Sequence, residues 1–206
     1  MPLQKNASTS VPIHDLLTRR WSTRAFDAGK PVSSAQIAAL AEAARWAPSC
    51  NNGQPWRFLM WNKSSDEAAW SKAFECLSAG NQAWVGNVPL LFLSCAASNW
   101  PDGKPNRYGA HDSGMALFSL MLQATALGLA AHAMAGFNND KAREAFAIPA
   151  DFTPQAMLAV GYQAAPDVLT DAVKEKELAP RVRRPLEETF FAGRWGRSAE
   201  LGSVSV

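Results

Sequence analysis

A run of 27 residues without one charged side chain, from Ser113 to Asn139, limits what this chain can fold into more than any other feature. The run is long enough to span a bilayer. Seven polar residues interrupt it, and its ends lack the basic asymmetry that orients a membrane helix. We therefore predict a buried helix over about 110–128, apolar on nearly all sides and ended by Gly128, with membrane insertion as the alternative. Such a helix suggests a core shared with a second subunit.

The charge of the chain supports the same idea. Charged residues make up 18% of the 206 residues, against about 25% in an average soluble protein. The net charge of +2 argues against a nucleic-acid binder and against a polybasic membrane binder. Eight Trp accompany only two Tyr. Low charge and many Trp together suggest that another subunit, a flat ligand, or both cover part of the surface.

Cysteine usage and the N-terminal sequence indicate a cellular location. Three cysteines without C-x-x-C spacing do not form a disulfide framework or a structural zinc site, and no metal site is predicted. No signal peptide is recognisable before the first apolar stretch. We expect a cytoplasmic protein.

Apolar spacing and capping residues predict the main elements. Ser33 and Gln36 form a capping box for a helix that ends by Ala47, and Ser64 with Glu67 suggests a second capping box. The predicted helices cover about 12–20, 34–47, 66–78, 110–128 and 140–146, the last capped by Asn139 or Asp140. The predicted strands cover 56–61, 89–96, 130–134 and 157–162.

The organisation along the chain has three parts. Residues 1–11 are expected to be flexible, 12–175 to form the main domain, and 176–206 to form a C-terminal extension. This extension is apolar and basic without clear period, so it is expected to pack against something, such as a partner subunit. The loop 99–107 is rich in Pro, Gly and Asn, and is the only candidate lid.

Several clusters of polar residues could carry chemistry. The segment 19–24 holds three arginines and two hydroxyls, which could bind a phosphate or merely form a solvated helix end. The stretch 181–184 is a second basic patch, or a solvated tail. The loop 48–56 offers amides and hydroxyls to a neutral ligand, or is an ordinary turn, and its Cys50 is a candidate nucleophile or a small loop residue. His111 with Asp112 could be an acid–base pair, although a structural role is favoured.

These segments together resemble the nitroreductase family of FMN-dependent oxidoreductases. The first motif is Arg20-Trp21-Ser22-Thr23-Arg24-Ala25-Phe26, followed by a helix ending in Ala-Arg-Trp-Ala-Pro-Ser at 44–49 and by Asn-Gly-Gln-Pro-Trp at 52–56. Weaker matches follow in the order of the family, at 81–85, 128–137 and 183–188. The resemblance runs from about Ile13 to Trp195.

The resemblance implies a fold and an assembly. The fold is α+β, with a mixed, mainly antiparallel sheet flanked by helices in three layers. The assembly is an intertwined homodimer with two FMN molecules at the subunit interface. The C-terminal extension typically crosses onto the partner and adds a strand to its sheet.

The resemblance also implies which residues bind FMN. Arg20, Ser22 and Arg24, with Trp21 in the same segment, contact the phosphate and the ribityl or pyrimidine side, while Arg181 and Arg183 close on the phosphate. Pro48, Ser49, Cys50 and Asn52 approach from the other subunit, and Asn81 contacts the pyrimidine edge. The N–H groups of Ala135 and Gly136 face N5 and O4 of the ring.

The implied activity needs no catalytic side chain, because the flavin itself carries the chemistry. FMN takes a hydride at N5 from NADH or NADPH and then reduces a nitroaromatic, a quinone or a related small aromatic acceptor, in a ping-pong mechanism. The alternatives are a specialised member, such as a reductive dehalogenase or a flavin-fragmenting enzyme, and a flavin-sequestering binding protein. The sequence does not distinguish NADH from NADPH.

Two residues depart from the family pattern. Several members have a Lys near the flavin N1 where this chain has Trp84, which predicts a lower flavin reduction potential unless an Arg substitutes. Trp84 is also the first candidate for an aromatic partner of the ring. Ala135 replaces an acidic residue of some members, and because the N5 contact is made by backbone, the change should be tolerated.

Overall fold

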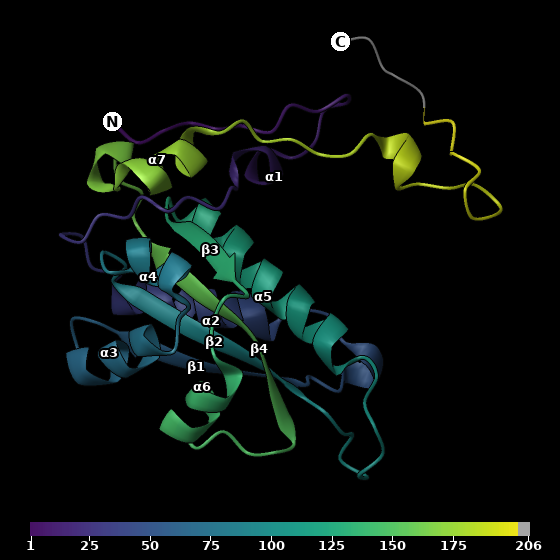
Figure 1. Ribbon diagram of the computed structural model, residues 1–206. Helices are drawn as coiled ribbons and strands as arrows, with labels where there is room; N and C mark the ends of the chain where they lie inside the picture. Colours follow the sequence, from purple (N-terminus) through teal and green to yellow (C-terminus); the bar gives the residue numbers. More distant parts are fainter. Residues whose placement is uncertain (202–206) are drawn as a thin grey trace.

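The computed structural model describes residues 1–201 and is built on one antiparallel sheet (Figure 1). Its four strands have the spatial order β1-β2-β4-β3, and every neighbouring pair is antiparallel. The strands are β1 (Trp56–Asn62), β2 (Leu90–Ala97), β3 (Ala130–Met134) and β4 (Phe152–Gly161). The predicted strands are thus all present, and β4 begins five residues earlier than expected.

Helices cover both faces of the sheet, which makes three layers. Alternate residues of β2 point to opposite faces: Leu91 and Leu93 pack into one apolar cluster, while Leu90 and Phe92 pack into the other. Burial on both faces explains why β2 reads as a continuous apolar run. The first layer holds α3 (Glu67–Glu75), α4 (Ala79–Val85) and α6 (Asn139–Ala145), and the second holds α2 (Ser34–Arg45) and α5 (Gly109–Ala126). The predicted α+β class is confirmed.

The uncharged run forms α5, the loop after it and β3. A Cβ at Gly109 would lie 2.3 Å from the backbone oxygen of Ala97, so only glycine lets the helix start this close to β2. Gly128, with a φ of +72°, follows the helix end as predicted. The prediction of burial on nearly all sides is wrong, because Ala110, Gly114 and Phe118 lie exposed along one face. Within residues 1–201, no helix has the length and hydropathy to cross a membrane.

Several element boundaries differ from the predicted ones. The first helix, α1 (Asp15–Arg19), is shorter than expected and begins after His14. Asp66, not Ser64, caps α3: its carboxylate accepts from the backbone N–H of Ala69 at 2.9 Å. Asn138 caps α6 in place of Asn139 or Asp140. Two helices were missed, α4 and α7 (Asp171–Leu178), since α4 is only seven residues long and α7 has little apolar content.

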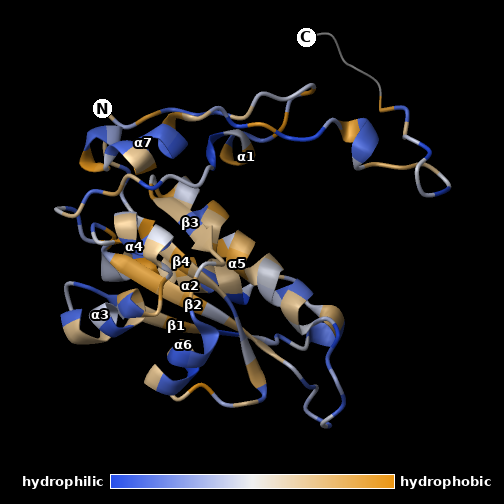
Figure 2. Cartoon of the chain, viewed as in Figure 1, coloured by the Kyte–Doolittle hydropathy of each residue, from blue (hydrophilic) through white to orange (hydrophobic). Residues whose placement is uncertain are grey.

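The chain after α7 forms an arm, residues 179–201, that extends away from the sheet (Figure 1). Its first residues lie beside the N-terminal segment, where Arg181 donates from Nη1 to the carbonyl oxygen of Lys5 at 2.5 Å. Farther along, the backbone hydrogen bonds between described residues join the arm only to itself, for example from the N–H of Ala199 to the carbonyl oxygen of Phe190. Val182 is 75% exposed and Trp195 is 91% exposed. The hydropathy view shows apolar positions along this arm (Figure 2).

Candidate functional site

An extended segment after α1 presents alternate side chains to one side. Thr23 and Ala25 are fully buried, whereas Arg20, Ser22 and Arg24 are half-buried and remain accessible. This period of two is what an extended backbone produces. The structure therefore brings these three predicted residues to one side of the segment.

Trp21 packs against the N-terminal segment. Its ring lies under the ammonium of Lys5, 4.7 Å from Nζ to the ring centroid. It lines a small pocket together with Arg19 and Arg20, and Ser22 and Arg24 do not line this pocket.

Three arginines from distant parts of the sequence gather at one end of the site, and we call Arg20, Arg181 and Arg183 the arginine cluster. Burial first, and then the positive charges of Arg181 and Arg183, lower the pKa of Arg20. Burial and Arg183 also lower the pKa of Arg181. No ion pair within residues 1–201 joins any of the three to a carboxylate. A dianionic phosphate would relieve this repulsion, and forked guanidinium donors suit its oxygens.

A cavity of about 360 Å³ opens on the other side of Arg24, and we call it the polar cavity. Gly136 forms part of its wall, where a Cβ would lie 2.6 Å from Ser78 Oγ and 2.8 Å from Asn81 Nδ2. Asn81 Nδ2 donates to the carbonyl oxygen of Gly136 at 2.9 Å and fixes this turn. The residues that line the polar cavity include Arg24, Ser78, Asn81, Trp84, His132, Ala135, Gly136 and Lys176.

Two backbone donors in the polar cavity are available to a ligand. Among residues 1–201, neither the N–H of Ala135 nor that of Gly136 donates a hydrogen bond. Unpaired N–H groups beside an amide side chain fit the carbonyl and nitrogen acceptors of a heterocyclic ring. The donor set of this structure therefore fits FMN, with phosphate at the arginine cluster and ring edge at the polar cavity.

Trp84 is part of the apolar core as well as of the cavity wall. It is 4% exposed, and its ring stacks against Phe26 at 6.0 Å and against His132 at 4.7 Å between centroids. A lysine at this position would bury its ammonium in the core, which costs folding free energy. Trp84→Lys is therefore expected to lower the stability of the fold as well as to change the charge at the cavity wall.

His132 is a neutral residue of the site. Burial lowers its pKa to about 4, and the charges of Arg24 and Arg20 act in the same direction, against the opposing hydrogen bond to Thr23. Its Nδ1 lies 2.9 Å from the carbonyl oxygen of Thr23, which can only accept, so Nδ1 carries the proton. The lone pair of Nε2 is then left as an acceptor.

The low pKa of His132 makes stability depend on pH. The unfolded chain, with the ordinary value of 6.5, takes up a proton before the folded chain does. The contribution of the neutral ring is thus complete above pH 6.5 and is lost toward pH 4, by about 3 kcal/mol. His132→Gln keeps a hydrogen-bond donor for the carbonyl oxygen of Thr23, and its free energy of unfolding should not fall in this way toward pH 4. Urea unfolding at neutral pH and at about pH 4 tests this, and equal losses for both proteins would contradict it.

The loop with Pro48, Ser49, Cys50 and Asn52 lies at the other end of α5. The backbone N–H of Cys50 donates to the buried carboxylate of Asp112 at 2.9 Å, near the first turn of α5. Arg20 instead borders a pocket with Thr125, at the last turn. About 13 residues of helix separate these points, or ~20 Å at 1.5 Å per residue. Within one chain, the structure does not bring this loop to the other predicted site residues.

Asp112 has a structural role here, as favoured from the sequence. It orients the loop through Cys50 and lies 2.9 Å from Nδ1 of His111. Asn51 and Asn52 both have a positive φ, of 50° and 53°, a conformation that asparagine tolerates better than most residues. The predicted lid, 99–107, borders a different cavity with Gly53 and Arg57.

The sequence analysis missed His132 and Glu177 as site residues, and it counted the hydroxyl of Thr23 as a candidate phosphate ligand, whereas this hydroxyl is buried and bound to Glu177. Glu177 is fully buried and ion-paired with Arg24 at 3.9 Å. Charged residues surround it in the sequence, so no apolar pattern indicates its burial. His132 lies in a recognised strand, and only its alternation along β3 could have suggested which side it faces.

Comparisons with known proteins identify the family and several relatives. The model of the family described as "Nitroreductase family" matches residues 17–162. A crystal structure described as an oxidoreductase containing FMN is 35% identical, with a TM-score of 0.87 over 96% of this chain and 100% of its own. A 15.4 kDa protein of Mycolicibacterium smegmatis is 38% identical over 58% of this chain and 80% of its own. A Stenotrophomonas maltophilia relative, whose name proposes an NADH dehydrogenase or NAD(P)H nitroreductase, is 30% identical over 72% and 84%.

Proposed function

Because this chain belongs to the nitroreductase family, we propose that it is an oxidoreductase which binds FMN and uses NADH or NADPH to reduce nitroaromatic, quinone or related acceptors. The observation that carries the proposal is the arginine cluster, three cations without a carboxylate partner in the described chain, beside a cavity with free amide donors. A ligand with a phosphate joined to a heterocyclic ring would pair with the arginine cluster and with the amide donors of the cavity at once.

The residues of this chain hold and orient the cofactor. Arg20, Arg181 and Arg183 bind the phosphate, and the hydroxyl of Ser22, whose oxygen accepts from Arg20 Nη1 at 3.5 Å, lies in the same region. Asn81 and the N–H groups of residues 135 and 136 fix the ring edge. When bound, FMN would supply the redox chemistry, the transfer of two electrons from NAD(P)H to the acceptor with protons taken up from water. No side chain has to become a nucleophile or a proton donor for this ping-pong sequence.

A homodimer accounts for the separation of the predicted site residues. The loop 48–52 and the arginine cluster lie at opposite ends of α5, so one FMN meets both only if they come from two chains. The exposed face of α5 supplies an interface, because Ala110, Gly114 and Phe118 recur every four residues and the helix has no charge after Asp112. The proposed dimer therefore packs α5 against its copy.

The arm is the second feature that a dimer would cover. Its apolar side chains Val182, Phe190 and Trp195 are all more than half exposed. Three exposed apolar side chains on one extended segment are typical of a surface that binds another protein chain. We propose that the arm lies across the partner and pairs with an edge of its sheet, where β1 and β3 each have an unpaired side in the described chain.

The experiment that tests the proposed function is reduction of the purified FMN-loaded protein by NADH or NADPH without oxygen, then reoxidation by a quinone or nitroaromatic. An enzyme completes both half-reactions, whereas a flavin-sequestering protein keeps the oxidised cofactor. Of the specialised alternatives, a dehalogenase would require a halogenated acceptor in the second step, and a flavin-fragmenting enzyme would consume the cofactor. A cytoplasmic location remains a prediction.

A further inference from the structure

Glu177 is a carboxylate in an unexpected place. It is 0% exposed, although it lies on α7, where most residues are exposed and polar. Burial of a charged carboxylate costs several kcal/mol unless hydrogen bonds and an opposite charge compensate it. The groups that contact this side chain therefore indicate its structural role.

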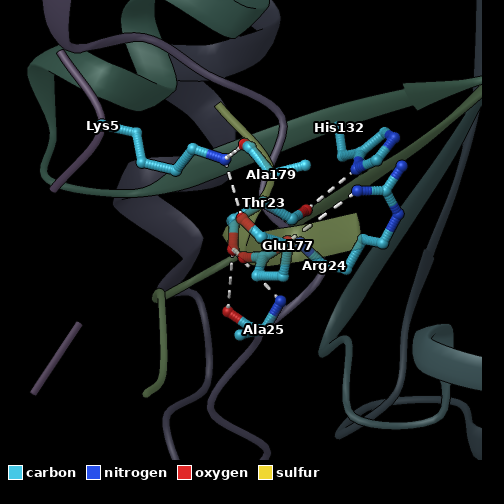
Figure 3. Close-up of polar contacts among 7 residues, drawn as sticks. All are labelled: Lys5, Thr23, Arg24, Ala25, His132, Glu177 and Ala179. Carbon is cyan, nitrogen blue, oxygen red and sulfur yellow. Dashed lines mark hydrogen bonds and ion pairs between the residues drawn. The ribbon is translucent and has the colours of Figure 1, made fainter. Parts of the chain in front are cut away.

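Each oxygen of Glu177 has its own partner in the segment that borders the polar cavity (Figure 3). Oε1 accepts a hydrogen bond from the hydroxyl of Thr23. Oε2 accepts from the backbone N–H of Arg24 at 2.9 Å and lies 3.9 Å from Nη1 of the same arginine. One carboxylate thus fixes both the backbone and the guanidinium of Arg24.

The same contacts reach His132. Thr23, held by Glu177 through its hydroxyl, accepts the Nδ1 proton of His132 with its carbonyl oxygen. Arg24 and His132 both line the polar cavity. Glu177 therefore orients two cavity residues while its own side chain stays outside the cavity.

Several cations surround the carboxylate of Glu177, among them Lys5, Arg24 and Arg181. Lys5 donates from Nζ to the carbonyl oxygens of Glu177 and Ala179, at 2.7 and 2.5 Å, so it anchors the end of α7. Lys176, also on the cavity wall, is exposed to solvent, where its charge is screened. The least exposed cation of the cavity is Arg24, and Glu177 neutralises it at close range.

We propose that Glu177 is a positioning residue that holds Arg24 and His132 at the polar cavity and, by neutralising Arg24, keeps the reduction potential of the bound flavin low. The inference rests on the proposed function. Two-electron reduction of a flavin with uptake of one proton at N5 leaves one negative charge on the pyrimidine side. An unpaired cation there would favour the reduced state, whereas an arginine paired with a carboxylate favours it less.

The test compares Glu177→Gln with Glu175→Gln, an exposed position on the same helix. A glutamine at 177 can accept from Arg24 N–H with its oxygen and donate to the Thr23 hydroxyl, so it removes the charge and keeps the contacts. Anaerobic potentiometry of the FMN-loaded proteins should show a higher potential for Glu177→Gln. We expect the reduced-to-oxidised ratio to rise at least about tenfold, or about 30 mV for a two-electron couple, with Glu175→Gln unchanged.

Two further variants extend the test, and the first of them does not depend on whether Glu177→Gln folds. Arg24→Gln leaves Glu177 as an uncompensated anion and should lower the potential, while the double variant restores a neutral pair and should return it toward the wild type. Shifts of the same sign in the two single variants, or a potential as unmoved as that of Glu175→Gln, would overturn the inference alone. A wild-type protein that does not take up FMN would overturn the proposed function as well.

Discussion

Replacing Phe118 by aspartate is expected to give a monomer that no longer retains FMN. Phe118 is 42% exposed on the uncharged face of α5, which the proposed dimer buries. A carboxylate buried there, once in each subunit, costs several kcal/mol. We expect the dissociation constant of the dimer to rise at least about thousandfold, equivalent to about 4 kcal/mol. Sedimentation velocity measures the mass, and flavin absorbance after desalting measures retention of FMN.

Val168→Asp is the matched control for this prediction. Val168 is an apolar residue whose exposed fraction, 47%, is similar to that of Phe118. It lies outside α5, in a short 3₁₀ turn before α7. This control should remain dimeric and yellow. A wild-type monomer that binds FMN, or a Phe118→Asp dimer that keeps it, would contradict the assignment of this face to a second copy.

Arg20→Ala is expected to weaken FMN binding by about 1.5–3 kcal/mol, the scale of a hydrogen bond to a charged group. The physical reason is that Arg20, like Arg181, is half-buried, so that desolvation strengthens its contact with phosphate. The same substitution relieves repulsion with Arg181 and Arg183, so the apoprotein should not lose thermal stability. Titration of the apoprotein with FMN, followed by quenching of flavin fluorescence, measures the affinity.

Arg19→Ala provides the control, because Arg19 precedes Arg20 in the sequence and is exposed. Its guanidinium is paired with Asp15 at 2.6 Å within α1, and such surface pairs contribute little. Its loss should leave FMN affinity nearly unchanged. If Arg20→Ala binds FMN as tightly as the wild type, or no more weakly than Arg19→Ala, Arg20 does not hold the phosphate.

The fold was predictable where one local signal dominated. The apolar run of β2, the Ser33–Gln36 capping box and the Gly128 stop each have one physical reading, and each is confirmed. Prediction failed where two residues compete for one role, as Ser64 and Asp66 do for the cap of α3. It also failed for α7, which buries only Val173 and Glu177 and therefore has no apolar pattern in its sequence.

The candidate site was predictable in its local parts only. Alternation along an extended segment places Arg20 and Arg24 on one side, and in the folded chain the positive charges of Arg181 and Arg183 lower the pKa of Arg20. The burial of Trp84 in the core was not predictable, because a tryptophan suits a ligand wall and an apolar core equally. Glu177 was missed because its partners lie more than 150 residues away in sequence, so only the folded chain reveals the pairing.

The central claim, that the site serves flavin-dependent electron transfer from a nicotinamide, is tested most directly by one spectrum. The purified protein, loaded with FMN and freed of oxygen, is mixed with NADH or NADPH while visible absorbance is recorded. We expect a yellow protein that bleaches within seconds and recovers its colour when a quinone or a nitroaromatic is added. A protein that takes up no FMN, or one that stays yellow with both nicotinamides, would contradict it.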